Sequence, residues 1–364
     1  MLDERYFDAR VHAAPSELRP APGALHLLLV TGDFAPRLAE IAAHMAPAPF
    51  YGAVVPYLIH DRRLVHSGLM VLSVPTVRAR AFMVDMRAGA AEIAQRMQGW
   101  DAMASLLLFV DGLSAHMDDF VEALQGVAVG RPVLGTGVGH HDLVQRPSVF
   151  AGEDIRRDAA LVVGLDSRLH VAARHGWRPL HGPLVVTRAA GNILYELNGQ
   201  PAFDVYRDTL RKSRGVDITR DAFFDVAKSH PFGISQFQGG EIVIRDPLDV
   251  QPDGSLVIVS SVRDMDILYV MQGDADELLA SSARLGREVL GRSPARQALL
   301  FDCISRVLFL EDGFSREIDA VVREARAPDL ALLGLTSVGE LTNVGYDRIR
   351  VLNKTTLLGL VHRD

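Results

Sequence analysis

The 364-residue sequence predicts a mixed α/β fold of the α+β class, built from repeated strand–helix–strand–strand units in two interlocked domains. Three segments open with an apolar run that ends at a small or acidic turn: His26–Val30, Leu106–Val110 and Ala298–Phe301. After a helix-like stretch, each segment has a short strand with glycine at its second position: Tyr51–Val54, Leu134–Gly137 and Leu333–Thr336. Each closes on another apolar strand: Leu69–Val74, Ala160–Leu165 and Thr356–Val361. A recurring supersecondary unit indicates a fold assembled from equivalent parts, whose loops can converge on a pocket.

The helices of the three units follow from apolar spacing. Residues 34–46 are predicted to be helical because Leu38, Ile41, Ala42 and Met45 recur at helical period. We expect Asp118 to cap the helix of the second unit and Ser315 to cap the helix of the third. The strands are short and some are almost entirely apolar, which predicts burial on both faces.

The segment between the second and third units has a different pattern. Residues 183–187 and 192–197 predict a hairpin, and residues 201–212 predict a helix with Pro201 in its first turn. Further strands are expected at 241–245, 255–260 and 266–271, followed by a helix over 274–290. We place a domain boundary near residue 195, which gives domains of residues 1–195 and 196–364.

The composition is that of a soluble globular protein, with 48% hydrophobic and 23% charged residues. A net charge of −7 argues against a nucleic-acid surface. The single cysteine, Cys303, excludes an internal disulfide and favours a reducing cytoplasm. The first residues do not resemble a signal peptide, and no apolar run approaches the roughly 18–20 residues of a membrane helix. We therefore expect a cytoplasmic protein that does not enter the membrane.

Several catalytic motifs are absent from the sequence. There is no Gly-Lys-Ser/Thr phosphate loop, no His-Glu-x-x-His and no Cys-x-x-Cys. Ser337 lies between Gly334 and Gly339, one residue too many for a nucleophile elbow. Gly135 to Gly139 resembles a dinucleotide-binding motif, but its third glycine comes too early and Pro147 stops any long helix. A close-packed glycine strand explains this segment better.

Two further patterns could carry chemistry. The histidines around residues 140 and 175 could supply a haem ligand, and four candidates remain open: His140, His141, His170 and His175. Arg306 lies three residues after Cys303 and could lower the pKa of its thiol. No general base is evident near Cys303, so a small buried side chain is the favoured interpretation of this residue.

An ordered set of motifs resembles the FIST family of sensory proteins, named for F-box and intracellular signal transduction. The C-terminal motifs are residues 298–306, the Gly334–Glu340 segment and Asn353–Thr355. The N-terminal motifs are Asp111–Ser114, Gly135–Gly139, Gly176–Pro179 and Val186–Thr187, and the junction is residues 195–206. The sequence departs from the family at Leu352, where a histidine is usual, and at Tyr51–Pro56, which replaces a more polar strand. These differences suggest a different or less polar ligand.

The resemblance implies a non-catalytic sensor of a small, amino-acid-like molecule, with output through a partner protein in trans. We expect no cofactor. The residues expected to line the ligand pocket are Asp111, Gly137, Gly139, Cys303, Arg306, Glu340 and Asn353. Arg306 is expected to pair with a ligand carboxylate and Glu340 with an ammonium group, so that Arg306→Ala would weaken binding by roughly 1.5–3 kcal/mol. Two alternatives stay open: a haem-based nitric oxide sensor that regulates a histidine kinase, and an enzyme that depends on Cys303.

Overall fold

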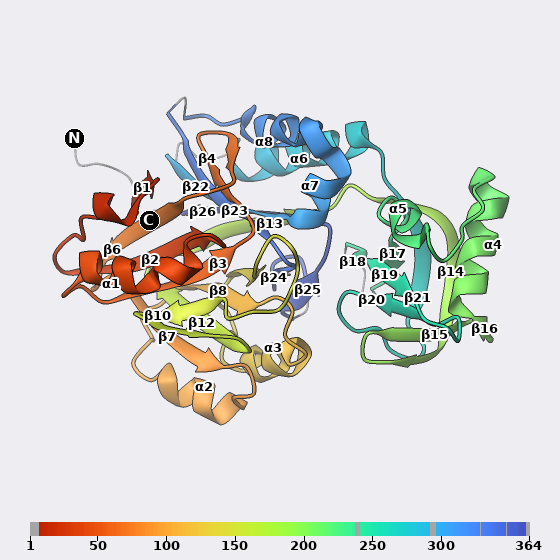
Figure 1. Cartoon of the computed structure of the whole chain (residues 1–364), viewed down its shortest axis with the longest axis horizontal. Coiled ribbons are helices and arrows are strands. Elements are labelled where there is room, and N and C mark those ends of the chain that lie inside the picture. Colours follow the sequence, from red (N-terminus) through yellow and green to blue (C-terminus); the bar gives the residue numbers. More distant parts are fainter. Residues whose placement is uncertain (1–6, 237–240, 292–295, 328, 347, 362–364) are drawn as a thin grey trace.

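The computed structural model describes residues 7–236, 241–291, 296–327, 329–346 and 348–361. Figure 1 shows two parts, which we call the body and the lobe. The body contains three six-stranded sheets and is formed by residues 7–177 and 273–361. The lobe is formed by residues 178–272, which are inserted between two strands of the body. The predicted α+β class is confirmed.

The three predicted units form the three sheets of the body. In each unit the first strand pairs in parallel with the glycine strand and antiparallel with the last strand. The first unit contains β2 (Ala24–Thr31), β3 (Phe50–Val55) and β6 (Leu69–Pro75). The second contains β8 (Ser105–Asp111), β9 (Val133–Val138) and β12 (Ala159–Leu165). The third contains β22 (Gln297–Cys303), β23 (Ala331–Ser337) and β26 (Thr356–Val361). The predicted repeat is therefore present in the structure.

Each sheet is completed by strands from outside its own three-stranded core. The hairpin that follows the glycine strand of one unit pairs with the glycine strand of another: β4–β5 joins the third sheet, β10–β11 the first, and β24–β25 the second. These strands are Leu58–His60, Arg63–Val65, Val149–Ala151, Asp154–Arg156, Glu340–Thr342 and Arg350–Leu352. One edge of each sheet is formed by β1 (Asp8–His12), β7 (Ala79–Asp85) or β13 (Leu169–Arg174), and the other edge by the second strand of the exchanged hairpin. This cyclic exchange interlocks the units and gives all three sheets the same strand order.

The glycines in these strands permit close approach of neighbouring strands. A Cβ atom on Gly52 would lie 2.0 Å from the carbonyl oxygen of Leu28, and one on Gly334 would lie 2.3 Å from that of Leu300. These residues are register partners, and Gly135 pairs with Leu108 in the same way. The register therefore aligns the units residue by residue.

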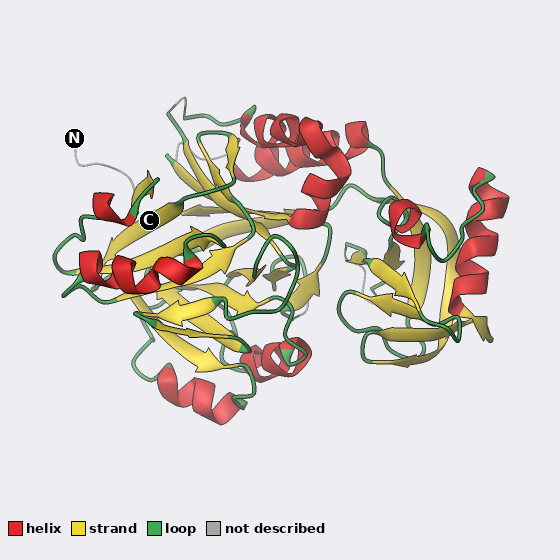
Figure 2. Ribbon diagram, in the orientation of Figure 1, coloured by secondary structure: helices red, strands yellow, loops and turns green. Residues whose placement is uncertain are grey.

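Helices cover the outside of the body, with the strands between them (Figure 2). They are α1 (Leu38–Met45), α2 (Ala90–Arg96), α3 (Met117–Gln125), α6 (Ala275–Val289), α7 (Ile304–Leu310) and α8 (Phe314–Val322). Short 3-10 helices span Pro15–Glu17, Ala35–Arg37 and Glu311–Gly313. No helix within the described residues is long and apolar enough to cross a membrane.

The two predicted caps are wrong. Asp118 lies inside the first turn of α3, because the preceding turn is already stabilised by the bond from the His116 amide to the Ser114 hydroxyl. Ser315 lies inside α8, because the 3-10 helix that ends at Gly313 leads directly into it. A carboxylate in the first turn still complements the helix dipole, so Asp118 remains favourable there.

The lobe is built on the predicted hairpin, β14 (Arg178–Ala190) with β15 (Ile193–Leu197). Its other strands are Gln200–Pro201, Phe232–Ile234, Val243–Arg245, Pro247–Val250, Leu256–Ile258 and Ile267–Gln272, labelled β16 to β21. Helices α4 (Ala202–Arg214) and α5 (Phe223–Ala227) complete it, and Figure 1 shows α4 on the side away from the body. Pro201 precedes α4 as its cap instead of occupying its first turn. The boundary at 195/196 falls inside β15, and the two-domain division stays a prediction.

Candidate functional site

A cleft of about 670 Å³ lies between the body and the lobe. Its body wall comes from α3 and from residues 345–346 and 348–351, around β25. Its lobe wall comes from residues 234–236, 243, 245, 261, 263 and 266. The facing strands β25 and β18 can be followed in Figure 1. Because its walls belong to two parts of the chain, the cleft depends on how those parts are held together.

Arg245 borders the cleft and is only 8% exposed. Its Nε donates to the carbonyl of Ser261 at 3.0 Å, and its Nη1 donates to the carbonyls of Ile244 and Val351, each at 3.0 Å. None of its partners among the described residues is a carboxylate. Burial lowers the pKa of Arg245 to about 10. This side chain therefore holds a cationic group in a buried position, and no described carboxylate is bonded to it.

Other charged groups of both signs line the cleft. Besides Arg245, the cationic residues are Arg263, Arg348 and Arg350, and the anionic residues are Asp118, Glu122 and Asp266. Asp118 and Asp266 oppose the fall in the pKa of Arg245, whereas Arg350 adds to it. The cleft thus offers separate cationic and anionic groups to a small polar molecule.

A second polar group lies in the body, centred on the buried side chain of Arg306. Its Nε donates to Glu317 at 3.1 Å and lies 3.4 Å from Asp302, and its Nη2 pairs with Glu317 and Ser282. Its Nη1 donates to the carbonyl of His175 at 2.6 Å and to that of Lys354 at 3.0 Å. Burial acts to lower the pKa of Arg306, but Glu317 and Asp302 outweigh it and raise that pKa. The group is a buried ionic network beside the third sheet.

Glu340 and Cys303 form the neighbouring part of this network. The Ser337 hydroxyl and the Thr355 amide donate to the two oxygens of the buried Glu340 carboxyl, the amide at 3.2 Å. Burial raises the pKa of Glu340 to about 8. The Cys303 sulfur lies 2.9 Å from the Ser305 hydroxyl, and burial raises its pKa to about 12. Burial therefore favours the neutral form of both groups.

Lys354 connects this network to the lobe. Its carbonyl accepts from Arg306 and, at 3.2 Å, from the indole of Trp177. Its fully buried ammonium group reaches into the lobe, where it donates to the carbonyl of Lys228 and pairs with Asp246, each at 3.0 Å. Asp246 directly follows Arg245 in the chain. A continuous set of polar contacts thus runs from the third sheet to the border of the cleft.

The structure brings some of the predicted pocket residues together. Arg306 and Glu340 contact the adjacent residues Lys354 and Thr355 respectively, and Cys303 interacts with Glu340. Asn353 precedes this pair and is buried. These residues form a solvent-excluded cluster, and none of them borders the cleft. That they bind a ligand stays a prediction.

The remaining predicted residues belong to the second unit. Asp111 accepts from the side chain of Gln145 and from the amide of Asp158, at 2.9 and 2.8 Å. The backbone of Gly137 is bonded to Gly339 and Val338 of the third unit, and a Cβ atom on Gly137 would lie 2.1 Å from the Val338 carbonyl oxygen. Gly139 donates instead to Val54 of the first unit. These glycines therefore serve contacts between units.

The geometry does not support the expected pairing of Arg306 with a ligand carboxylate. An arginine has five N–H groups, and here the nitrogens that carry them are all engaged inside the protein. The side chain is also fully buried. The sequence placed Arg306 near Cys303 and Glu340 correctly, but its contacts are those of a structural cation.

Three residues of this region were missed from the sequence. Arg245 and Asp246 lie at the end of the strand predicted over 241–245, where nothing distinguishes them from other charged strand residues. Lys354 was part of a recognised motif, but its contact with the lobe joins residues 108 positions apart in sequence, which spacing alone cannot reveal. The positive φ of 51° at Lys354 is likewise not evident from a lysine.

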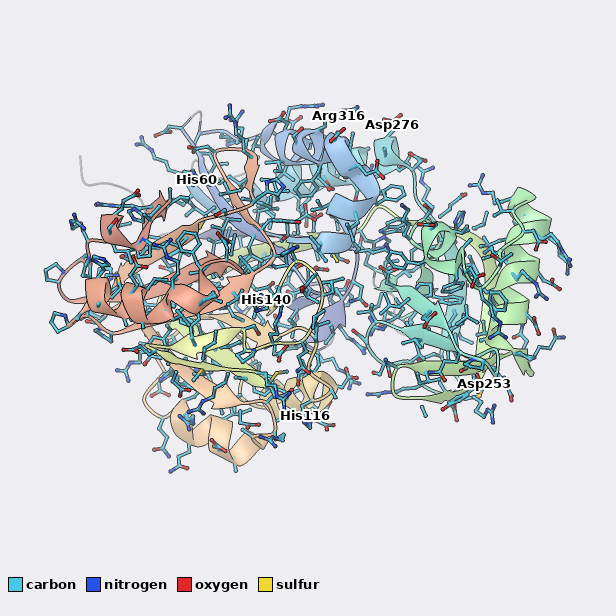
Figure 3. All side chains as sticks on the ribbon, viewed as in Figure 1. His60, His116, His140, Asp253, Asp276 and Arg316 are labelled. Atoms are coloured by element: carbon cyan, nitrogen blue, oxygen red, sulfur yellow. The ribbon has the colours of Figure 1, made fainter. Side chains whose placement is uncertain are left out.

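The histidines considered as haem ligands lie in different environments. His140, labelled in Figure 3, is buried in the loop after β9 and packs against Gly32. His175 is buried, and its Nδ1 accepts from the Trp177 amide at 2.9 Å; burial lowers its pKa to about 3. His141 and His170 are exposed. Within the described part of the chain, no three metal-ligating side chains gather into one group.

The alignment of the units shows how unusual the polar cluster is. The register makes three cluster positions of the third unit equivalent to buried apolar positions in the other two, whereas Cys303 corresponds to the buried polar residues Thr31 and Asp111. The equivalent residues are Val30 and Val110 for Asp302, Val55 and Val138 for Ser337, and Leu58 and Val149 for Glu340. Because burying ionisable groups is costly and the same fold forms without them, the fold alone does not require this cluster.

Comparison with known proteins shows the family to which this chain belongs. Residues 25–200 match the FIST N domain, and residues 202–343 match the FIST C domain. The chain therefore belongs to the FIST family, whose domains are associated with signal transduction and small-ligand sensing. A segment of 142 residues is 25% identical to an uncharacterized protein, MJ1623, of Methanocaldococcus jannaschii. That match covers 36% of this chain and 27% of that relative, so it carries no argument about function.

Proposed function

We propose that this protein is a cytoplasmic, non-catalytic sensor that binds a small polar ligand in the cleft between the body and the lobe. The observation that supports it best is the position of the cleft, whose walls come from both parts. The chain passes between these parts twice, near residues 174–178 and 272–275. A ligand that contacts both walls favours one arrangement of the two parts over others, which is how hinged binding proteins respond to ligands.

The contacts of Lys354 provide a route for this response. Its ammonium group binds Asp246 in the lobe, and its carbonyl is held by Arg306 in the body. A ligand bound beside Arg245 lies next to the lobe end of this route, because Asp246 directly follows Arg245 in the chain. The output is a changed lobe position that a partner protein in trans, such as a histidine kinase, recognises.

The ligand class agrees with the charges of the cleft. Separate cationic and anionic groups suit an amino-acid-like molecule with a carboxylate and an ammonium group. Haem is less well supported, because both buried candidate histidines already have protein contacts. An enzyme using Cys303 is also less well supported, because burial keeps its thiol protonated.

The test is thermal unfolding against amino acids, small organic acids and haemin. A ligand at a hundred times its dissociation constant adds about 2.7 kcal/mol of stability. A variant that fills the cleft, Ser235→Trp, is compared with Ser213→Trp on the exposed surface of α4. The proposal requires that Ser235→Trp abolishes the shift and Ser213→Trp leaves it intact. Equal shifts in both variants would place the ligand elsewhere.

A further inference from the structure

The side chain of Arg245 has unused hydrogen-bonding capacity beside the cleft. Its Nε and Nη1 donate to three carbonyl oxygens, whereas no partner of Nη2 occurs among the described residues. Nη2 is not fully buried. The accessible space that Arg245 borders is the cleft. Two N–H groups of a fixed guanidinium beside this space are therefore left without an acceptor among the described residues.

Among the residues that the structure describes, no carboxylate forms an ion pair or hydrogen bond with the Arg245 side chain. Three carbonyl dipoles hold the guanidinium in place, but they do not neutralise it. Asp118 and Asp266 act on it only from a distance, and Arg350 opposes them. Buried cations in proteins are normally paired, and arginine N–H groups match the oxygens of carboxylate and phosphate groups.

We infer that the cleft binds a ligand through a compact oxyanion group, a carboxylate or a phosphate, that pairs with Nη2 of Arg245. This inference rests on the proposed function and specifies the chemistry of its ligand. The oxyanion lies at the border of the cleft beside Arg245, where the carbonyls of Ser261 and Val351 fix the orientation of the guanidinium. The rest of the ligand lies toward α3, where Asp118 can accept hydrogen bonds from it.

The decisive experiment supplies Arg245 with a counter-ion from the protein itself. Ser261 lines the cleft, and its carbonyl lies 3.0 Å from Nε of Arg245. Ser261→Asp places a carboxylate beside the guanidinium, and Ser261→Asn is the neutral control of the same size. Binding of malonate and of inorganic phosphate is measured by calorimetry at constant ionic strength, with chloride as the reference anion. The probe that binds with the higher affinity shows whether the site prefers a carboxylate or a phosphate group.

We expect at least one probe to bind the wild type, and Ser261→Asp to weaken its binding roughly 10- to 100-fold more than Ser261→Asn does. Arg245→Gln should lose binding to a similar extent, and its unfolding curve reports whether it folds. If neither probe binds better than chloride, or if Ser261→Asp and Ser261→Asn bind equally, the inference is wrong. A neutral ligand that Ser235→Trp excludes but Ser261→Asp does not would preserve the proposed function and overturn only the oxyanion site.

Discussion

Replacing Arg306 with alanine tests whether this residue is structural or binds ligand. The substitution leaves the buried Glu317 carboxylate without its cation and removes the donors to the carbonyls of His175 and Lys354. Removing one partner of a buried ion pair costs about 3–5 kcal/mol. Domains are stable by only about 5–15 kcal/mol, so the loss should be large. Urea unfolding followed by circular dichroism measures it as a lower midpoint.

Two comparison variants make this test specific. Arg323→Ala removes an exposed arginine from the region just after α8 and should change stability by no more than about 0.5 kcal/mol. The double variant Arg306→Met/Glu317→Leu replaces the pair by apolar side chains and should recover much of the loss, because apolar replacement of a buried pair is often neutral. Asp302 can remain protonated there, since burial raises its pKa. A fully stable Arg306→Ala variant with weakened ligand binding would refute the structural role and restore the original pocket.

Three further predictions follow from buried contacts. Folding raises the pKa of Glu340 from 4.5 to about 8, so the unfolded chain releases this proton at lower pH and the free energy of unfolding falls as the pH rises through that interval. Glu340→Gln should remove up to about 1.4 kcal/mol per pH unit of this dependence, measured as the free energy of unfolding at several pH values. Gly286→Ala should destabilise the protein by about 1–3 kcal/mol in thermal unfolding, because its Cβ would lie 1.8 Å from the Val321 carbonyl oxygen, whereas Gly126→Ala has open space and should be nearly neutral. Lys354→Met leaves Asp246 buried without its cation, so the substitution should accelerate amide hydrogen exchange more in the lobe than in the first sheet. Equal acceleration in both would argue against a local link.

The sequence predicted the repeated units because their signal is local. Apolar strands such as β8 and β22 are buried along their whole length, and each follows the same order of strand, helix and glycine strand. The exchange of hairpins between sheets could not be predicted. It depends on contacts such as Leu58 with Leu335, which lie far apart in sequence and carry no pattern that specifies the partner.

The candidate site was predicted less completely, for a related reason. Cys303, Glu340 and Arg306 were placed in one group because they belong to the motifs that resemble the FIST family. Their roles depend on burial and on exact partners, and the same residue types would be read differently at a surface. Arg245 carried no signal because its significance comes from what is missing beside it, namely a carboxylate.

The lobe is inserted into the same unit that carries the ionic cluster around Arg306 and Glu340. The edge strand and first strand of a unit are joined by residues 13–23 in the first unit and 86–104 in the second, but by residues 175–296 in the third. The lobe is thus an insertion into the connection that leads to β22. The buried charges of the cluster meet this insertion through Lys354 and Asp246. The units without an insertion have apolar residues at the positions of Asp302, Ser337 and Glu340, so the cluster accompanies the connection between the third sheet and the lobe, which forms one wall of the cleft.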